Sequence, residues 1–381
     1  MTKTRKIILL GATGSIGSST LRLLRKKRDH FKLIGISANK NASKLLKIAK
    51  EFNVKYVAIS DKKIAKKYNH SSKILVGSEG LIELASIKCD IVISGIAGIC
   101  GLLPAISAIR SGNNLAIANK EPLVVAGNIF IQEAKKNNVK ILPVDSEHSS
   151  IFQCFNESHR ENISHITLTA SGGPFLNLNK SEFKKIQPKD AIRHPNWKMG
   201  KKISVDSSTL INKALEIIEA GVLFNLKSHQ IDVIIHPESI VHGLVHYRDG
   251  SVIANLSLPD MISPLAVALG YPNRMNLNYE QLDLKKISNL TFGKPDLNKF
   301  PGLSFGWKSL DAGGAYPIIL NAANEIAVEY FLKNIVSYNN IIDIIKFSLS
   351  KVNAKTPKDI EDSIEIDRIT RLEVLNYIKG L

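Results

Sequence analysis

An alternation of short β-branched runs with amphipathic stretches, between residues 6 and 145, constrains the fold of this chain most. Such alternation is typical of parallel strands whose connecting helices cover both faces of one sheet. We therefore predict an α/β fold that begins with a Rossmann-like, doubly wound parallel sheet. The predicted strands are KIILLG, FKLIGIS, VKYVAIS, CDIVISG, NLAIAN and VKILPV.

Two further strand-like runs, at 163–171 and 232–239, follow the alternating region. They are separated by a long stretch at 171–206 that is rich in Gly, Pro and polar residues. A loop of that length in a compact domain is usually a lid or a binding loop. Farther on, the turn RDG at 248–250 lies between two more strand-like runs and predicts a β-hairpin.

The segment DSSTLINKALEIIEAG at 206–221 is predicted to form one helix. Asp206 or Ser207 can cap its start, and Gly221 can end it. Helical patterns also dominate the end of the chain, after a weakly periodic stretch. The expected parts are a doubly wound domain at 1–148, a mixed α/β domain at 149–275 with a loop at about 171–201, a linker at 276–299 and a helical domain at 300–381.

The chain of 381 residues has 51 lysines and arginines against 34 acidic residues, a net charge of +17. Lysines are scattered along the chain rather than gathered in a basic arm or recognition helix, so no nucleic-acid partner is expected. The excess charge favours a lysine-rich surface that also attracts a phosphorylated or acidic substrate. No apolar run is long enough to span a membrane, and the N-terminus lacks a signal-peptide pattern, so we expect a cytoplasmic protein without a membrane partner.

The segment at 6–24, KIILLGATGSIGSSTLRLL, combines a strand, a glycine turn and the start of a helix. Gly11 permits the tight turn, Gly14 lets the backbone approach a pyrophosphate, and Gly17 lets the helix pack on the strand. The free N–H groups and the dipole at the helix N-terminus favour phosphates. The spacing departs from GxGxxG, but the strand–turn–helix context favours dinucleotide binding over a purely structural turn.

About twenty residues later, the sequence SANKN at 37–41 ends the second predicted strand. Enzymes that use NAD usually place a carboxylate there to bind the ribose 2′-hydroxyl. This segment has no carboxylate, whereas Lys40 could pair with the 2′-phosphate of NADP. The pattern favours NADPH over NADH, unless Lys40 is only one more surface lysine.

The stretch ILPVDSEHSS at 141–150 places Asp145 and Glu147 on either side of Ser146, where a strand gives way to a helix. Acids at that position could cap the helix by accepting bonds from its free N–H groups. They could equally hold a divalent cation, because hard cations prefer oxygen ligands.

Two further segments carry polar side chains that could line a substrate cleft. Asn212, Lys213 and Glu216 share one narrow wedge of a helix, which is either a solvated face or the wall of a cleft. The segment HPNWKMG at 194–200 combines an ionisable ring, a large aromatic and a cation, as a lid over a polar substrate would. Alternatively, Trp197 is only a local packing anchor.

With these motifs in place, the chain closely resembles the 1-deoxy-D-xylulose 5-phosphate reductoisomerase family over nearly its whole length. The motifs that occur in the family's order and spacing are GATGSIG, ANKE, PVDSEHSSIFQ, SGGPF, RHPNWKMGKKISVDSSTLINKALEIIEA, IHPESIVHG and LNAANEIAV. The resemblance implies an NADPH- and metal-dependent homodimer of the non-mevalonate isoprenoid pathway. It also implies a reaction that rearranges a carbon skeleton by retro-aldol cleavage and re-addition, followed by reduction to 2-C-methyl-D-erythritol 4-phosphate.

The resemblance also implies which residues contact each ligand. The implied ligands of Mg2+ or Mn2+ are Asp145, Glu147 and Glu216. The implied NADPH contacts are Gly11, Thr13, Gly14, Ser15, Ile16, Gly17, Ala38, Asn39, Lys40, Asn41, Asn119, Glu121 and Gly200. The implied substrate contacts are Lys120, Ser146, Ser171, His194, Trp197, Met199, Ser207, Asn212 and Lys213. The implied catalytic residues are Lys120, Asp145, Glu147, Glu216 and His194.

Two residues depart from the family pattern, and one other class of enzyme competes with it. Asn39 stands where a small residue is expected near the 2′-phosphate, and Pro122 stands where a serine is expected, which alters only a helix start. The competing class is a two-domain NADP-dependent dehydrogenase of the semialdehyde or homoserine type. That class predicts a catalytic Cys or Lys and no metal.

Overall fold

The computed structural model describes residues 4–197, 199–351 and 355–381. These residues form two compact units, each built from several stretches of chain. The first unit comprises residues up to 122, 130–149 and 260–280, and the second comprises 123–129, 150–259 and 281 onward. These units do not show which parts of the chain fold independently, so the domain boundaries expected from the sequence stay predictions.

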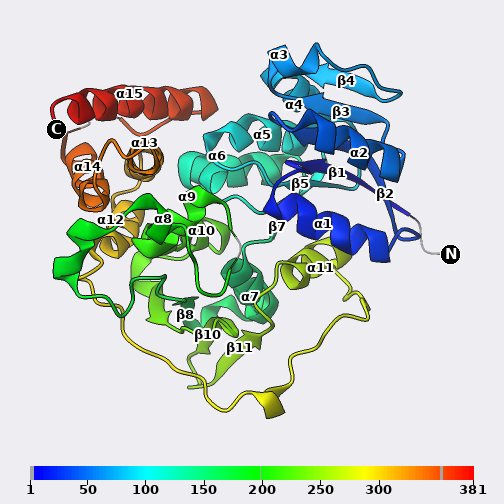
Figure 1. Ribbon diagram of the computed structural model, residues 1–381. Helices are drawn as coiled ribbons and strands as arrows, with labels where there is room; N and C mark the ends of the chain where they lie inside the picture. The colour runs from blue at the N-terminus through cyan, green and yellow to red at the C-terminus, as the bar shows by residue number, and fades with distance from the viewer. Residues whose placement is uncertain (1–3, 198, 352–354) are drawn as a thin grey trace. The chain divides into compact units, whose positions relative to one another are not determined.

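The first unit contains a seven-stranded sheet in the order β4-β3-β2-β1-β5-β6-β7, in which every neighbouring pair is parallel. This confirms the predicted doubly wound sheet (blue to cyan in Figure 1). The strand order reverses between β1 and β5, and ligands of such sheets bind beside that reversal, at the carboxyl ends of the strands. The strands are β1 Arg5–Leu10, β2 Phe31–Ala38, β3 Tyr56–Ile59, β4 Lys73–Val76, β5 Ile91–Ser94, β6 Asn114–Ile117 and β7 Ile141–Pro143.

Strand β1 shows why this sheet is parallel and covered on both faces. Residues 7–10 form a continuous apolar run, and each has no exposed surface. A strand covered by helices on both faces needs such a run instead of alternating polar residues. The helices of this part of the chain are α1 Ser15–Lys26, α2 Ala42–Phe52, α3 Lys62–Ala65, α4 Gly77–Ser86, α5 Leu102–Arg110, α6 Glu121–Lys136, α7 Ser146–Cys154 and α11 Ile262–Gly270.

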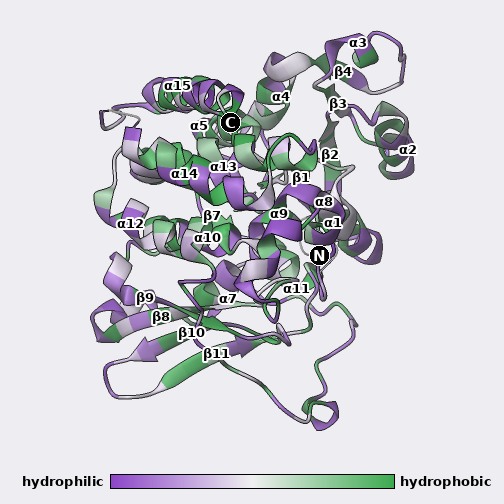
Figure 2. Cartoon of the chain, turned by 60° about the vertical axis from the view of Figure 1, so that its left-hand side comes forward, coloured by the Kyte–Doolittle hydropathy of each residue, from purple (hydrophilic) through white to green (hydrophobic). Residues whose placement is uncertain are grey.

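The second unit contains a four-stranded sheet in the order β11-β10-β8-β9. Only β8 and β9 pair in parallel, and the other pairs are antiparallel. The predicted hairpin joins β10 to β11, where the amide of Gly250 donates to the carbonyl of Tyr247 at 3.1 Å. Strand β11 is an edge strand, and Figure 2 colours its first residues as hydrophobic. The strands are β8 Ile163–Ala170, β9 Ile231–Ile235, β10 Val241–Tyr247 and β11 Val252–Leu256.

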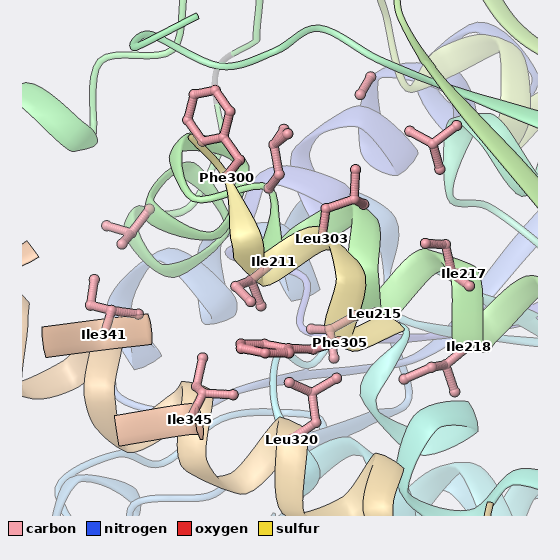
Figure 3. Packing of buried hydrophobic residues seen from close by; sticks show 14 of the residues in the cluster. Ile211, Leu215, Ile217, Ile218, Phe300, Leu303, Phe305, Leu320, Ile341 and Ile345 are labelled. Atoms are coloured by element: carbon pink, nitrogen blue, oxygen red, sulfur yellow. The ribbon is translucent and has the colours of Figure 1, made fainter. Parts of the chain in front are cut away.

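Helices fill the rest of the second unit and confirm the predicted C-terminal helical region. Apolar residues from four of these helices and from the turn before α12 interdigitate in one core, as Figure 3 shows for Ile211, Leu215, Phe305 and Ile341. The helices are α8 Pro188–Ala191, α9 Lys201–Ser208, α10 Ile211–Leu223, α12 Ser304–Ala312, α13 Tyr316–Leu332, α14 Tyr338–Lys351 and α15 Ile360–Lys379. Among the described residues, no helix has both the length and the apolar character needed to cross a bilayer.

The prediction of a single helix at 206–221 is wrong. Helix α9 ends at Ser208, and Leu210 adopts a left-handed conformation with φ of 59° before α10 begins. The hydroxyl of Thr209 accepts the amide of Ile211 at 3.3 Å and donates to backbone carbonyls of α9, which interrupts the helical ladder. Gly221 does not end α10 but lies inside it, where an added Cβ would lie 2.6 Å from the Leu310 side chain.

Candidate active site

The glycine turn after β1 has the geometry that close approach of a dinucleotide requires. Gly11 adopts φ of 84°, and a Cβ added to it would lie 2.5 Å from the carbonyl oxygen of Gly95. A Cβ added to Gly17 would lie 2.5 Å from the backbone of Ala12, so α1 packs directly on the turn. Gly14, at the start of α1, is exposed and is free of such a clash.

The first turn of α1 carries no acidic residue, which leaves its N-terminus favourable for an anion. Thr13 and Ile16 are half-buried at this turn, and Ser15 is exposed. The hydroxyl of Ser37, at the end of β2, accepts the amide of Gly11 at 3.0 Å. The end of β2 is thus hydrogen-bonded to the glycine turn.

The residues that follow β2 present a basic surface beside that turn. Ala38 is buried, whereas Asn39, Lys40 and Asn41 are exposed. Asn41 caps α2 by accepting the amide of Lys44 at 3.2 Å. Its side chain is therefore occupied by a structural role, which leaves Lys40 as the better placed side chain for an anionic group.

Asn119, which follows β6, has a buried side-chain amide. Its Oδ1 accepts the hydroxyl of Ser94 at 2.8 Å. Its Nδ2 is buried and has no hydrogen-bond partner among the described residues. Buried donors in native proteins are normally satisfied, so this atom is suited to a ligand or an ordered water. The neighbouring Glu121 is also buried and begins α6, with Pro122 in the first turn of the helix.

Asp145 lies at the start of α7 and is bonded by two basic side chains. Its Oδ2 accepts the ammonium of Lys120 at 2.7 Å, and its Oδ1 lies 3.3 Å from Nδ1 of His148. Its backbone carbonyl accepts the amide of Ser149 at 2.8 Å. The carboxylate is therefore engaged by side chains, while the backbone of the same residue starts the helix.

The surroundings of Asp145 keep it ionised. Burial raises the pKa of its carboxyl, but the Lys120 ammonium and the hydrogen bond with His148 outweigh burial and hold the pKa well below its ordinary value. A metal ligand must be deprotonated, and this carboxylate is. Nearby, the hydroxyl of Ser146 donates to the carboxylate of Glu147 at 2.9 Å.

Glu216, on α10 in the second unit, is the focus of a buried polar cluster. Its carboxylate accepts hydrogen bonds from the amide of Asn212 and from the ammonium of Lys213. Lys213 is 4% exposed and Glu216 is 1% exposed, so the polar wedge predicted from the sequence is not a solvated face. The wedge is a buried arrangement in which an amide, a cation and an anion meet.

His194 links the segment that follows β8 to the long loop. Its Nδ1 accepts the backbone amides of Trp197 at 3.0 Å and Asn196 at 3.2 Å. The proton of the neutral ring must then be on Nε2, which lies 2.9 Å from the hydroxyl of Ser171. Burial lowers the pKa of His194 to about 4, in keeping with a neutral ring at physiological pH.

The long loop contains short helices, and it also contacts β10. The indole of Trp197 stands edge-on to the ring of His242, with centroids 6.2 Å apart. Met199 is half-buried and Gly200, before α9, is exposed. Lys198, the cation of the predicted lid segment, lies outside the described residues.

Gly173 brings the segment of Ser171 onto the end of α9. It adopts φ of 69°, and an added Cβ would lie 2.8 Å from the carbonyl oxygen of Ser207. The structure therefore brings Ser171, His194 and Ser207 into one region of the second unit. In the first unit it brings Lys120, Asp145, Ser146 and Glu147 together.

Sequence reasoning missed two buried polar residues, one that bonds to Asp145 and one on the same helix as Glu216. His148 has no exposed surface and bonds to Asp145, and its position three residues later on the same helix was a usable signal. Glu219 also has no exposed surface and follows Glu216 at the same spacing on α10. An acid repeated on the buried face of a helix is a pattern that the sequence already contained.

Comparisons with known proteins agree over almost the whole chain. Family models described as 1-deoxy-D-xylulose 5-phosphate reductoisomerase and as its C-terminal domains match residues 7–127, 141–224 and 256–373. A 1-deoxy-D-xylulose 5-phosphate reductoisomerase of Clostridium botulinum (strain 657 / Type Ba4) is 46% identical over 375 residues, which cover 96% of this chain and 97% of the relative. The corresponding protein of Clostridium tetani is 45% identical over 373 residues, with the same shares covered.

Solved structures give the same result. A DOX-P reductoisomerase in complex with NADPH, fosmidomycin and magnesium has a TM-score of 0.95 at 39% identity, with 98% of each chain covered. A 1-deoxy-D-xylulose 5-phosphate reductoisomerase from Zymomonas mobilis in complex with NADPH has a TM-score of 0.93 at 38% identity, with all of both chains covered.

Proposed function

The chain belongs to the 1-deoxy-D-xylulose 5-phosphate reductoisomerase family, and we propose that it catalyses the reaction for which the family is named. In this reaction the carbon skeleton of 1-deoxy-D-xylulose 5-phosphate is rearranged and then reduced by NADPH to 2-C-methyl-D-erythritol 4-phosphate. The observation that carries the proposal is similarity over 96% of the chain, which includes every motif that supplies a polar site residue. The competing semialdehyde or homoserine dehydrogenase is not favoured by it.

NADPH fits the carboxyl edge of the first unit's sheet. The turn at Gly11 leaves no room for a side chain, and the start of α1 offers free N–H groups and has no acidic residue in its first turn. The buried Nδ2 of Asn119 offers a donor that has no partner among the described residues. Lys40 would bind the 2′-phosphate. The proposed contacts remain those expected from the sequence, from the turn at 11–17 to Asn119, Glu121 and Gly200.

A divalent metal fits the donor chemistry of the carboxylates. Asp145 is held ionised, Glu147 lies two residues away, and the family resemblance implies Glu216 as the third carboxylate. These are hard oxygen ligands, which suit Mg2+ or Mn2+ better than a soft metal. Relatives with magnesium bound support the same assignment.

When bound, NADPH supplies a hydride and the metal polarises substrate oxygens. The chain itself binds, orients and encloses the substrate. We assign Lys120 and Ser146 to substrate hydroxyls near the carboxylates. Ser171, Ser207, Asn212 and Lys213, with His194, would bind the phosphate and the adjoining backbone of the sugar.

The loop at 171–201 would shield the reacting groups from water. Its Trp197 and Met199 supply apolar surface, and exclusion of water strengthens the polar contacts inside a site and protects reactive intermediates. In the described structure, Trp197 is already packed against His242, and His194 is fixed by two backbone amides. The loop is therefore tied to β10 through Trp197, and its own backbone is fixed by His194.

The protein is proposed to act as a homodimer in the cytoplasm. Strand β11 is the edge of its sheet, and Val252 and Ile253 on it are 47% and 48% exposed. An apolar edge strand is normally covered by a partner or protected by charges. A reaction that consumes NADPH and a sugar phosphate belongs where both metabolites are made.

Product analysis tests the proposed function. The purified protein is incubated with 1-deoxy-D-xylulose 5-phosphate, NADPH and Mg2+, and the product is identified by carbon NMR. Formation of 2-C-methyl-D-erythritol 4-phosphate is expected, with no oxidation of NADPH when aspartate semialdehyde replaces the sugar phosphate. Turnover of the semialdehyde and none of the sugar phosphate would instead establish the competing dehydrogenase.

A further inference from the structure

We propose that Asn324 of α13 is a positioning residue for the substrate phosphate, acting through the turn that carries Ser207. The inference rests on the proposed function, because it takes Ser207 to contact the phosphate. Asn324 belongs to the motif LNAANEIAV, to which the proposed chemistry assigns no role. Its contacts explain why a polar motif lies in the core of the C-terminal helices.

The turn of Ser207 is packed against the segment of Ser171. A Cβ on Gly173 would lie 2.8 Å from the carbonyl oxygen of Ser207 and 3.1 Å from the Cα of Ser208. Backbone lies directly on backbone at this point, so neither segment can shift without the other. The position of this turn therefore sets the positions of both serine hydroxyls.

The side chain of Asp206, the residue before Ser207, is buried. Asp206 is 1% exposed, and its Oδ2 lies 2.9 Å from the ammonium of Lys202. Its Oδ1 accepts a hydrogen bond from Nδ2 of Asn324 at 2.9 Å. This bond joins α9 to α13, and it fixes the orientation of the amide, because only the nitrogen of Asn324 can donate to a carboxylate.

Packing alone does not account for an asparagine at position 324. The residue has no exposed surface, and its Oδ1 has no hydrogen-bond partner among the described residues. A buried acceptor without a partner costs free energy that an apolar side chain would avoid. We therefore attribute the choice of asparagine to its Nδ2 group, which donates to the carboxylate of Asp206.

A second C-terminal helix supports the same turn. The hydroxyl of Tyr338, at the start of α14, donates to the carbonyl of Ser208 at 2.7 Å. The Tyr338 ring stands edge-on to Phe175, with centroids 5.4 Å apart and an interplanar angle of 86°. Phe175 follows Gly173 by two residues. Helices α13 and α14 therefore contact the segment of Ser207, and α14 also contacts the segment of Ser171.

A swap of the hydrogen-bonding groups tests this role. Asn324→Asp places a second carboxylate against Asp206, so the turn should shift and KM for 1-deoxy-D-xylulose 5-phosphate should rise about tenfold. KM for NADPH should stay at the wild-type value, because the cofactor turn belongs to the other unit. The double variant Asp206→Asn with Asn324→Asp restores one donor and one acceptor, and KM for the sugar phosphate should return to within about threefold of wild type.

Asn321→Asp is the matched control. Asn321 is equally buried on α13, but its amide donates to Glu325 of the same helix at 3.3 Å. This variant should lower the melting temperature while KM for the sugar phosphate stays unchanged. If Asn324→Asp fails to fold, Asn324→Ser removes the same bond without adding a charge and should raise the same KM.

The outcomes separate this inference from the proposed function. A wild-type protein that does not turn over the sugar phosphate would overturn both. An active wild type whose KM is unaltered in the Asn324 variants would overturn this inference alone. So would an equal rise in KM for NADPH, or a double variant that shows no recovery.

Discussion

The cofactor edge of the first unit and the polar clusters of the second are built by different means. At the cofactor edge the important atoms are backbone, and glycines at 11 and 17 exist because a Cβ would meet other backbone within 2.5 Å. In the second unit the important atoms are side chains, such as Lys213 and Glu216, which are buried and paired with one another. A site built from backbone is disturbed mainly by changes in backbone packing. A site built from side chains is disturbed mainly when those side chains are replaced.

The largest effect is expected from a substitution in the side-chain cluster of the second unit, which should leave the cofactor edge of the first unit unchanged. Glu216→Gln should reduce turnover at least about a hundredfold, because it removes a proposed metal carboxylate at nearly constant volume. The Kd for NADPH, measured by fluorescence titration, should not change. Glu329→Gln, on an exposed pair with Lys333, is the control and should keep full activity. Full activity of Glu216→Gln at saturating Mg2+ would remove Glu216 from the metal site.

The converse test replaces a glycine in the closely packed turn of the cofactor edge. Gly17→Ala forces a methyl against the backbone of Ala12, so we expect a loss of about 1–3 kcal/mol in the free energy of unfolding. Denaturant titration measures this loss. Gly14→Ala meets nothing closer than 3.4 Å and should keep the stability of the fold while weakening NADPH binding. Equal stability of the two variants would show that the turn is not closely packed.

A smaller effect tests Lys40, the side chain of the cofactor edge that is proposed to bind the 2′-phosphate. Lys40→Gln should raise KM for NADPH about tenfold and leave KM for NADH unchanged, because a single charge-assisted bond to the 2′-phosphate is lost. Steady-state kinetics with both cofactors measures the ratio. Lys47→Gln, on the exposed face of α2, serves as the control. If the two lysine variants behave alike, Lys40 is only a surface lysine.

The smallest effect concerns the protonation of His194. Its pKa in the folded protein is about 4, below the unfolded value of about 6.5, so the unfolded state binds the proton first as pH falls. The histidine-linked part of the stability is therefore fully present above pH 6.5 and is lost as the pH falls towards 4. Nitrogen NMR of the ring should show a proton on Nε2 and no titration near neutral pH. A midpoint near 6.5 would contradict the hydrogen bonds at Nδ1.

The same contrast explains what the sequence could predict. The glycine turn and the parallel sheet follow from local spacing, so β1 and Gly11 were found without knowledge of the fold. The edge strand β4, Lys73–Val76, was not among the predicted strands. The helix at 206–221 was misjudged because its periodicity outweighed the hydroxyls of Ser208 and Thr209, which bond to backbone carbonyls.

The partners of buried side chains were beyond local pattern. The carboxylate of Asp206 is held by Asn324, 118 residues later in the chain, and no spacing rule connects them. His148 was within reach, since it lies three residues from Asp145, but a lone histidine on a helix is usually a core residue. The resemblance to a family implies residue roles that the residues alone left open, including a metal-ligand role for Asp145 that stays a prediction.

The most direct test of the account is oxidation of NADPH by 1-deoxy-D-xylulose 5-phosphate as the metal is withdrawn and restored. We predict oxidation in Mg2+, its loss in excess EDTA, and its full return when Mg2+ is added back, with NADPH bound at the same affinity throughout. That result is the one expected if turnover needs a bound divalent metal and NADPH binding does not. Unchanged oxidation in EDTA, or loss of NADPH binding together with the metal, would contradict it.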